Sequence, residues 1–507
     1  MRRGSLGFYC TMVEAISRRV FLAGLGAALS HSAAYAEAPA LSLRPPLRLK
    51  DARALAGPEA VLSGSGLSGR VAFAVADAET GLELETVEPG LALPPASVAK
   101  ALTALYALET LGPSHRFRTR VLADGPVENG VLKGDLILAG GGDPTLDTDA
   151  LAALVRALKE SGLREVRGAF KVYDGSLPEV FSIDPEQPEH VGYSPAVSGI
   201  ALNFNRVHFE WKRAGKGWSV SMDARSAKIR PAVAIAEMKV VSRALPIYTY
   251  EQRQRIDSWT VASQALGQDG SRWLPVRKPA LYAGDVLQTL ARSNGIVLGR
   301  VEVVKSLPGG ARTLVHHDSA PLEDILRDML KYSTNLTAEM VGLAATVARG
   351  KRPATLRASA EEMSVWAAER YGLRGSRLVD HSGLGDASRM TARDLVAILV
   401  QAGKTGRLPR MLKDIPMRDQ KGRVVKGHPI KVAAKTGTLN FVSGLGGFMT
   451  AADGTVLAFA ILTADPDRRA AIPPEDRERP EGARGWNARS KKLQQALIER
   501  WGAIYGS

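Results

Sequence analysis

The sequence predicts a mixed α/β (α+β) fold in which a β-rich module interrupts a domain of helices and strands. Its 507 residues exceed what one compact core usually holds, which favours two or three domains. Short β-like runs separated by turns dominate residues 119–320, whereas strong helical patterns begin after residue 320. We therefore expect one domain built from residues 37–118 and 321–507, and an inserted module of two subdomains at residues 119–320.

The first 36 residues have the layout of an export signal. Arg18 and Arg19 precede a short apolar run that ends in small residues around Ala36, which is the pattern of a cleaved signal peptide. The arginine pair is typical of a twin-arginine signal, which a receptor reads. The run is broken by glycines and is too short to span a bilayer. We expect an exported, periplasmic protein that is soluble or peripherally membrane-associated, with Met12 as an alternative start.

The composition narrows the function classes. The chain is 45% hydrophobic and 23% charged, as is usual for a soluble globular protein. The net charge of +15 favours an anionic partner, but no basic stripe with interleaved aromatic residues is present, so we expect no nucleic-acid partner. The one cysteine, Cys10, lies in the signal segment. The mature chain is therefore expected to lack disulfides, thiol nucleophiles and thiolate metal sites, and the oligomeric state stays open.

Before the module, the sequence predicts a strand pair and one helix. Residues 69–89 hold two β-like runs around a turn at Glu79-Thr80-Gly81. A proline-rich stretch then leads into an amphipathic run, which predicts a helix from near Ser97 to a stop at Gly112-Pro113.

After the module, helical patterns cover residues 321–350, 359–372 and 390–406. An alternating stretch follows, with an Asp453-Gly454 hairpin signal between two apolar runs, and it predicts paired strands. The chain closes with a helical pattern near its end. The charged segment 465–485 is expected to be a solvated loop.

The first of three short motifs carries the residues for serine chemistry. In Ser97-Val98-Ala99-Lys100 the lysine amine lies one helical turn from the hydroxyl, close enough to act as its base. The first turn of a helix also points backbone N–H groups at developing negative charge. Ser97 is therefore a candidate nucleophile and Lys100 a candidate base, although a lone serine at a helix start is more often a cap.

Two further motifs lie in the expected later elements. Ser333-Thr334-Asn335 occupies a polar turn before a helix, and Lys435-Thr436-Gly437 lies on a predicted strand. In the strand motif the lysine supplies a cation, the threonine a hydroxyl, and Gly437 room for a substrate backbone. A second Lys-Thr-Gly at residues 404–406 follows a helix stop and has no partner motif. We expect that copy to be a loop without a catalytic role.

Together, Ser-x-x-Lys, Ser-x-Asn and Lys-Thr-Gly are the signature set of penicillin-binding proteins and class A β-lactamases. The chain resembles the penicillin-binding D-alanyl-D-alanine carboxypeptidase/endopeptidases of the large-insert serine class. The likeness extends to residues 138–146, 202–207 and 379–391, and it covers nearly all of the mature chain. The wide separation of the first two motifs matches the insert of that class.

Two positions depart from the family pattern. Thr334 stands where aspartate is usual, which leaves Ser333 and Asn335 in place. Residues 380–385 read Asp-His-Ser-Gly-Leu-Gly instead of Asp-Gly-Ser-Gly-Leu-Ser, and we expect this change to affect only the rim of the site.

The resemblance implies a penicillin-binding/β-lactamase-like transpeptidase domain with an antiparallel sheet flanked by helices. It implies that Ser97 attacks the bond between two terminal D-alanines of a peptidoglycan stem peptide. Lys100 would be the base, and Ser333 would return the proton to the leaving amine. β-Lactams would be covalent inhibitors, and no metal or other cofactor is expected.

The same resemblance implies the binding residues. Asn335 would orient Lys100 and bond the substrate backbone, and Lys435 would hold the relay serine and attract the terminal carboxylate. Thr436 and Thr438 would bind that carboxylate beside Gly437. Backbone N–H groups of the nucleophile and of Thr438 would form the oxyanion hole.

Other interpretations remain open. A β-lactamase or esterase could use the same Ser-Lys chemistry, and it would release a penicilloyl group quickly. A non-catalytic wall-binding scaffold would not be labelled by penicillin. His316-His317-Asp318 suggests a metal site, but adjacent residues on a strand point to opposite faces, so we do not expect one.

Overall fold

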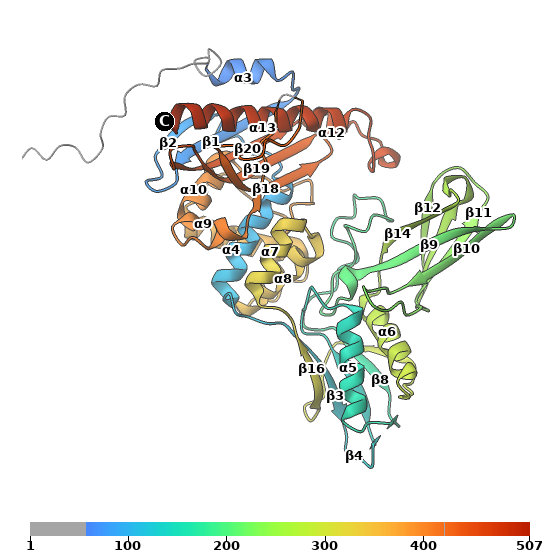
Figure 1. Cartoon of the computed structure of the whole chain (residues 1–507). Coiled ribbons are helices and arrows are strands. Elements are labelled where there is room, and N and C mark those ends of the chain that lie inside the picture. The colour runs from blue at the N-terminus through green and yellow to red at the C-terminus, as the bar shows by residue number, and fades with distance from the viewer. Residues whose placement is uncertain (1–56, 420, 507) are drawn as a thin grey trace, which may run out of the picture. The chain divides into compact units, whose positions relative to one another are not determined.

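The computed structural model of the chain describes residues 57–419 and 421–506, so the predicted export signal lies outside the described residues. Within them the chain forms five sheets and a set of helices (Figure 1). The mixed α/β prediction is confirmed.

The largest sheet joins the two ends of the described chain. Its strand order is β17-β18-β19-β20-β1-β2, and every neighbouring pair is antiparallel. The predicted strand pair and the hairpin near Asp453-Gly454 are both confirmed. The strands are β1 (Arg70–Asp77), β2 (Glu83–Val87), β17 (Lys413–Asp414), β18 (Lys431–Leu439), β19 (Val442–Thr450) and β20 (Val456–Ala464).

Helices cover both faces of this sheet, and the side chains of β1 pack alternately against the helices on each face. Ala72 and Ala74 belong to a core cluster shared with helices α4 and α10, whereas Phe73 packs edge-on against Trp501 of α13. This alternation is the period of two that a strand imposes. The helices are α3 (Pro58–Gly64), α4 (Lys100–Leu111), α7 (Leu322–Tyr332), α8 (Asn335–Ala348), α9 (Leu356–Tyr371), α10 (Ala392–Gly403), α11 (Arg407–Met411), α12 (Pro466–Ala470) and α13 (Ala483–Tyr505).

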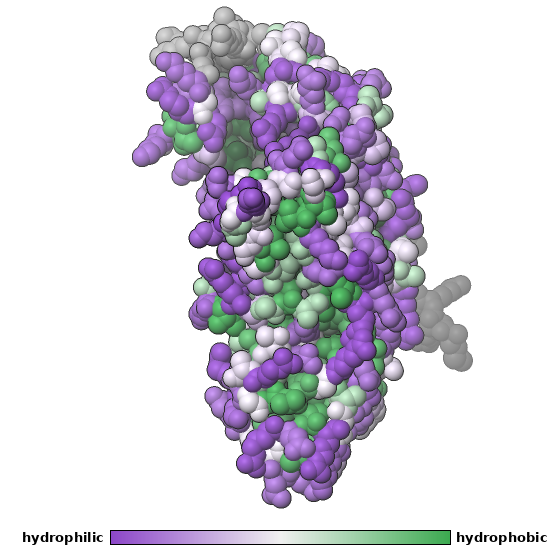
Figure 2. All heavy atoms as spheres, turned by 90° about the vertical axis from the view of Figure 1, so that its right-hand side faces the viewer, coloured by the Kyte–Doolittle hydropathy of each residue, from purple (hydrophilic) through white to green (hydrophobic). Residues whose placement is uncertain are grey.

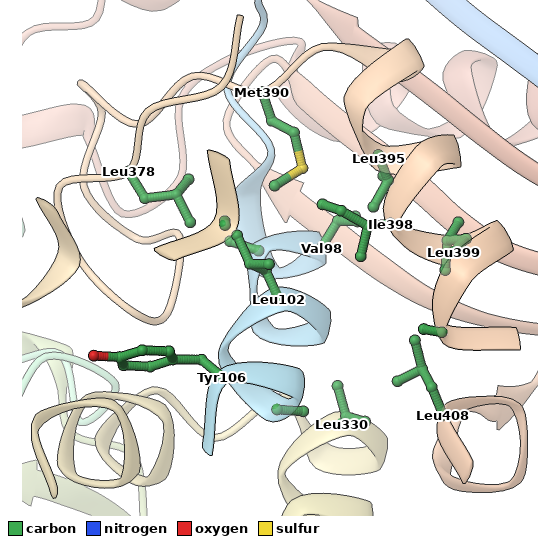
Figure 3. Packing of buried hydrophobic residues seen from close by; sticks show 14 of the residues in the cluster. Val98, Leu102, Tyr106, Leu330, Leu378, Met390, Leu395, Ile398, Leu399 and Leu408 are labelled. Carbon is green, nitrogen blue, oxygen red and sulfur yellow. The ribbon is translucent and has the colours of Figure 1, made fainter. Parts of the chain in front are cut away.

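Helix α4 lies at the centre of the larger core cluster. Figure 3 shows Leu102 and Tyr106 of this helix among apolar side chains from surrounding elements, including Leu330 of α7 and Ile398 of α10. The sequence suggested an amphipathic helix, but most of its first eight residues are buried. A fully buried leucine stabilises the fold by about 1.5–3 kcal/mol. The helix that carries Lys100 is therefore held rigidly from several sides.

Residues 119–320 are rich in strands, as predicted, but they also contain two long helices that were not predicted. Helix α5 (Thr148–Glu160) begins at Asp147, whose side chain accepts a hydrogen bond from the Ala150 N–H, and helix α6 (Pro279–Ser293) begins at a proline. Such caps are helix-start signals. The β-like texture of the neighbouring runs masked them.

The sheets in this region are smaller. A five-stranded sheet has the order β15-β8-β6-β3-β16, and three-stranded sheets have the orders β10-β9-β14, β11-β13-β12 and β4-β5-β7. The chain enters the region along β3 and leaves it along β16. These two strands pair antiparallel, with Arg118 opposite Asp318. The strands are β3 (Arg118–Asp124), β4 (Val127–Glu128), β5 (Val131–Leu132), β6 (Asp135–Ala139), β7 (Glu165–Val166), β8 (Phe170–Tyr173), β9 (Arg206–Ala214), β10 (Gly217–Asp223), β11 (Ala236–Val241), β12 (Tyr248–Gln252), β13 (Asp257–Ala262), β14 (Asp269–Pro275), β15 (Val301–Val304) and β16 (Arg312–Asp318).

Hydrophilic side chains cover much of the face that Figure 2 presents. On this face, hydrophobic residues reach the surface in patches separated by hydrophilic ones. Across residues 57–419 and 421–506, every helix is too short or too polar to cross a bilayer.

Candidate active site

The Ser-x-x-Lys motif forms the start of α4. Ser97 lies in a short 3-10 turn (Ala96–Ala99), and Lys100 is the first residue of the helix. The Lys100 Nζ atom lies 2.9 Å from the Ser97 Oγ atom, and the lysine side chain is completely buried. Ala96 has a φ of 46°, a strained value for a residue with a side chain. Such strain is typical of functional turns.

The Ser-x-Asn motif forms the break between α7 and α8. Ser333 has a φ of 61° and ends α7 with an N–H bond to the Met329 carbonyl, and Asn335 opens α8. The Asn335 Oδ1 atom accepts a 2.7 Å hydrogen bond from Lys100 Nζ. The polar turn predicted at this motif is confirmed: it divides the helical pattern over residues 321–350 into two helices and directs both polar side chains toward the first motif.

The Lys-Thr-Gly motif lies on β18, as predicted. Lys435 is buried, and its Nζ atom donates to the Ser333 Oγ atom at 2.9 Å and to the Thr436 carbonyl at 2.7 Å. Lys100 thus connects the first motif to the second, and Lys435 connects the second to the third. Ser97, Ser333, Asn335 and Thr438 all line one cleft of about 410 Å³.

The remaining strand residues divide between the two faces. Thr436 and Thr438 are exposed, whereas Lys435 and Gly437 are buried. Thr438 lines the cleft, and the structure gives Thr436 a contact with the site through its carbonyl oxygen. The sequence alone did not distinguish these two threonines.

The lack of a side chain at Gly437 also has a structural cause within the fold. A Cβ atom there would lie 2.7 Å from the Pro95 carbonyl oxygen and 3.1 Å from the Ser97 nitrogen, distances too short for a side chain. The backbone that approaches Gly437 closely is that of the turn that carries Ser97. The glycine lets β18 pack directly against Ser97.

Burial changes the acid–base properties of both lysines. It lowers the pKa of Lys100 from 10.5 to about 8, although the nearby Asp380 and Glu339 carboxylates act in the opposite direction. Burial also lowers the pKa of Lys435 to about 6, and the positive charges of Lys100 and Lys413 add to this effect. An amine with a pKa near 8 is a practical base at neutral pH.

A loop that was expected at the rim lies directly against Lys100. The Ser382 carbonyl accepts a 2.7 Å hydrogen bond from Lys100 Nζ and completes its set of three partners. His381, where the family pattern has glycine, is fully buried and contacts Ser359 Oγ at 2.8 Å. Burial lowers the pKa of His381 to about 3, so its ring is neutral. The departure at His381 is therefore inside the protein, whereas that at Gly385 is half-buried.

The cleft has two walls that the motifs did not indicate. Residues 184–193 supply one, and the Asn335 Nδ2 atom donates to the Tyr193 carbonyl at 3.0 Å. The segment after β20 supplies the other, where Arg477 donates to the Glu186 carboxylate at 2.8 Å. The expectation that residues 465–485 are merely a solvated loop was wrong. Both walls depend on contacts between distant residues, which leave no local signal.

The second Lys-Thr-Gly lies elsewhere. Lys404 follows α10 and is exposed, and the three residues form the turn before α11. The interpretation of this copy as a surface loop is confirmed.

Comparison with known proteins gives a consistent result. The model of the D-Ala-D-Ala carboxypeptidase 3 (S13) family matches residues 59–478. A D-alanyl-D-alanine carboxypeptidase of Actinomadura sp. (strain R39) is 29% identical over 80% of this chain and 79% of its own. A carboxypeptidase of Mycobacterium tuberculosis is 30% identical over 82% of this chain and 80% of its own.

The fold is also found among solved structures. Penicillin binding protein 4 of Haemophilus influenzae superposes with a TM-score of 0.70 at 20% identity, over 87% of this chain and 99% of that chain. That likeness confirms the predicted penicillin-binding fold. The family match spans most of the sequence, and the Mycobacterium relative reaches 30% identity over most of both chains. The chain therefore belongs to the D-Ala-D-Ala carboxypeptidase 3 (S13) family of penicillin-binding serine peptidases.

Proposed function

We propose that the protein hydrolyses the terminal D-Ala-D-Ala bond of peptidoglycan stem peptides through an acyl-enzyme on Ser97. The observation that carries this proposal is the 2.9 Å contact between Lys100 Nζ and Ser97 Oγ beside the cleft. A serine hydroxyl becomes an effective nucleophile when such a base lies within hydrogen-bond reach.

Acylation would proceed in two proton steps. The neutral Lys100 amine takes the Ser97 hydroxyl proton as Oγ attacks the carbonyl carbon, and the resulting oxyanion is held by the backbone N–H groups of Ser97 and Thr438. The proton then passes through the Ser333 hydroxyl to the leaving nitrogen, and the C–N bond breaks. Water later hydrolyses the ester, which frees Ser97 and the shortened peptide.

Lys435 and the exposed strand hydroxyls would bind the substrate's terminal carboxylate. An anion beside a buried amine favours its charged form, so the bound carboxylate raises the pKa of Lys435. Thr438 is in position for this role because it lines the cleft. Thr436 is assigned the same role on its exposure alone. Asn335 would orient Lys100, whose Nζ donates to its Oδ1 atom, and bond the substrate backbone.

β-Lactams would acylate the same serine. Penicillin binding protein 4 of Haemophilus influenzae, which shares this fold at 21% identity, has been solved in complex with a β-lactam. We also propose that the protein cleaves peptide cross-links as an endopeptidase, and that it acts in the periplasm after export. In this proposal residues 37–118 and 321–507 carry the chemistry, and the module at 119–320 supplies one wall of the cleft.

The two Lys-Thr-Gly copies provide a matched test. We expect Lys435→Ala to lower the rate of acylation by a fluorescent penicillin by about 10²–10³-fold, because it removes the cation that meets the carboxylate. The Lys404→Ala control should acylate at the wild-type rate. Equal rates for the two variants would contradict the proposed role of Lys435. Mass spectrometry of digested muropeptides identifies the products and separates carboxypeptidase from endopeptidase activity.

A further inference from the structure

Two buried carboxylates near Lys100 have no part in the mechanism above. Glu339 of α8 is completely buried, and Asp380 is 2% exposed. Burying an ionised carboxylate is costly unless hydrogen bonds and a countercharge compensate. Both must therefore be well partnered, and their partners lead to Lys100.

Asp380 acts on the loop that contacts Lys100. Its Oδ1 atom accepts a 2.7 Å hydrogen bond from the Gly383 N–H. That N–H belongs to the same peptide group as the Ser382 carbonyl, which accepts from Lys100 Nζ at 2.7 Å. One amide thus has a carboxylate at its N–H end and an amine at its carbonyl end. Hydrogen bonds in such a chain polarise and strengthen one another.

Glu339 fixes the same loop from the opposite side. Its carboxylate accepts from the His381 N–H at 3.0 Å and from the Ser382 N–H at 2.8 Å. Glu339 lies one helical turn after Asn335, whose side chain also accepts from Lys100 Nζ. Helix α8 therefore places two of the three Lys100 partners, one directly and one through the loop.

We propose that Asp380 and Glu339 are positioning residues that hold Lys100 against Ser97 through the Ser382–Gly383 peptide. As negative charges near the amine, they also favour its ammonium form. This proposal rests on the proposed role of Lys100 as the base. Neither carboxylate touches the substrate in it.

Lys435 provides a comparison for the pKa of Lys100, because it is also a buried lysine. Burial and the positive charges of Lys100 and Lys413 lower the pKa of Lys435 to about 6. Lys100 is buried more completely, yet its pKa is about 8. The neighbouring charges account for this contrast, because the Asp380 and Glu339 carboxyl groups favour the ammonium form of Lys100, whereas Lys100 and Lys413 disfavour that of Lys435. The other ionisable groups around Lys100 are Lys435, the neutral His381 and, beyond Asp380, Asp184.

The test is the pH dependence of acylation in Asp380→Asn and Glu339→Gln. The limiting rate constant is measured at saturating fluorescent penicillin, so that the bound carboxylate keeps Lys435 charged. We expect the wild-type rate to rise through about pH 8 as Lys100 loses its proton. In each variant the midpoint should move down by up to about one pH unit, because a carboxyl group whose charge favours the ammonium form is gone. The shift should be smaller in Glu339→Gln, because burial raises the pKa of the Glu339 carboxyl to about 8 and leaves it only partly ionised.

Asp394→Asn is the matched control. Asp394 is 7% exposed and also fixes a loop, by accepting from the Gly375 N–H at 3.0 Å and the Ser376 hydroxyl at 2.8 Å. A merely structural role for Asp380 or Glu339 would change the rate without moving the midpoint, as we expect for this control. An unchanged midpoint in folded Asp380→Asn and Glu339→Gln would overturn the proposal.

Two other outcomes are distinguishable. Absence of acylation in the wild-type protein would overturn the proposed function itself. If neither variant folds, Asp380→Glu and Glu339→Asp keep the charge and displace the carboxylate by one methylene group; a lowered limiting rate of acylation would support the positioning role, and wild-type rates in both would overturn it.

Discussion

The Ser97→Ala variant is expected to lose D-alanine release and penicillin labelling together. Removing a catalytic serine nucleophile lowers turnover by roughly 10⁴-fold or more. The fold should survive, because Ser97 is half-buried at the cleft and the change removes a single oxygen atom. The measurements are release of D-alanine from a peptide that ends in D-Ala-D-Ala, and gel fluorescence after incubation with a fluorescent penicillin.

Ser63→Ala is a suitable control for Ser97→Ala. Ser63 lies on α3, and its hydroxyl donates to the carbonyl of Ala60 in the same helix. Both assays should give wild-type values for it. Penicillin labelling that persists in Ser97→Ala would place the nucleophile elsewhere, and rapid loss of the label from the wild-type protein would indicate a β-lactamase instead.

The Lys100→Met variant is expected to lose both activity and stability. Methionine has a similar length but no amine, so Ser97 loses its base, and we expect the rate of acylation to fall by at least about 10³-fold. Removing one partner from a buried group of charges typically costs about 3–5 kcal/mol of the free energy of unfolding. Here the groups left without a countercharge are Glu339 and Asp380.

The stability loss should depend on pH in a known direction. Burial raises the pKa of both the Glu339 and Asp380 carboxyl groups, and without Lys100 nothing cationic opposes that shift. Ionisation then destabilises the folded state as the pH rises above the unfolded carboxyl range, and protonation restores stability as it falls. Thermal unfolding should therefore show a larger deficit at about pH 8 than at about pH 5. Lys404→Met should show no deficit, and a deficit that grows toward acid would contradict the account.

The sequence predicted the residues of the site better than their surroundings. Ser97, Lys100, Asn335 and Lys435 each stand at the start or the middle of a regular element, and Ser333 stands in the turn between two helices; local pattern is sufficient to identify such positions. The structure brings these five side chains together as the motif order suggested.

What the sequence left out was determined by long-range packing. The third partner of Lys100 is a backbone carbonyl, and a carbonyl has no residue type by which it could be recognised. His381 fits only because Gly342 of α8 has no side chain, since a Cβ there would lie 2.2 Å from the imidazole ring. Neither residue alone signals that contact. The wall of the cleft that contains Arg477 could not be predicted for the same reason, because it depends on a contact with Glu186, far away in the sequence.

The distance in sequence between Ser97 and strand β18 has a consequence for how the cleft is assembled. Ser97 is among the first residues of the described chain to be synthesised, whereas its neighbouring strand β18 is among the last. Contacts between such distant segments form slowly, because a long loop must close first. A nascent or truncated chain that ends before β18 contains Ser97 and Lys100 but cannot build the cleft around them. The cleft that Ser97 and Thr438 line is therefore complete only when both ends of the described chain are present.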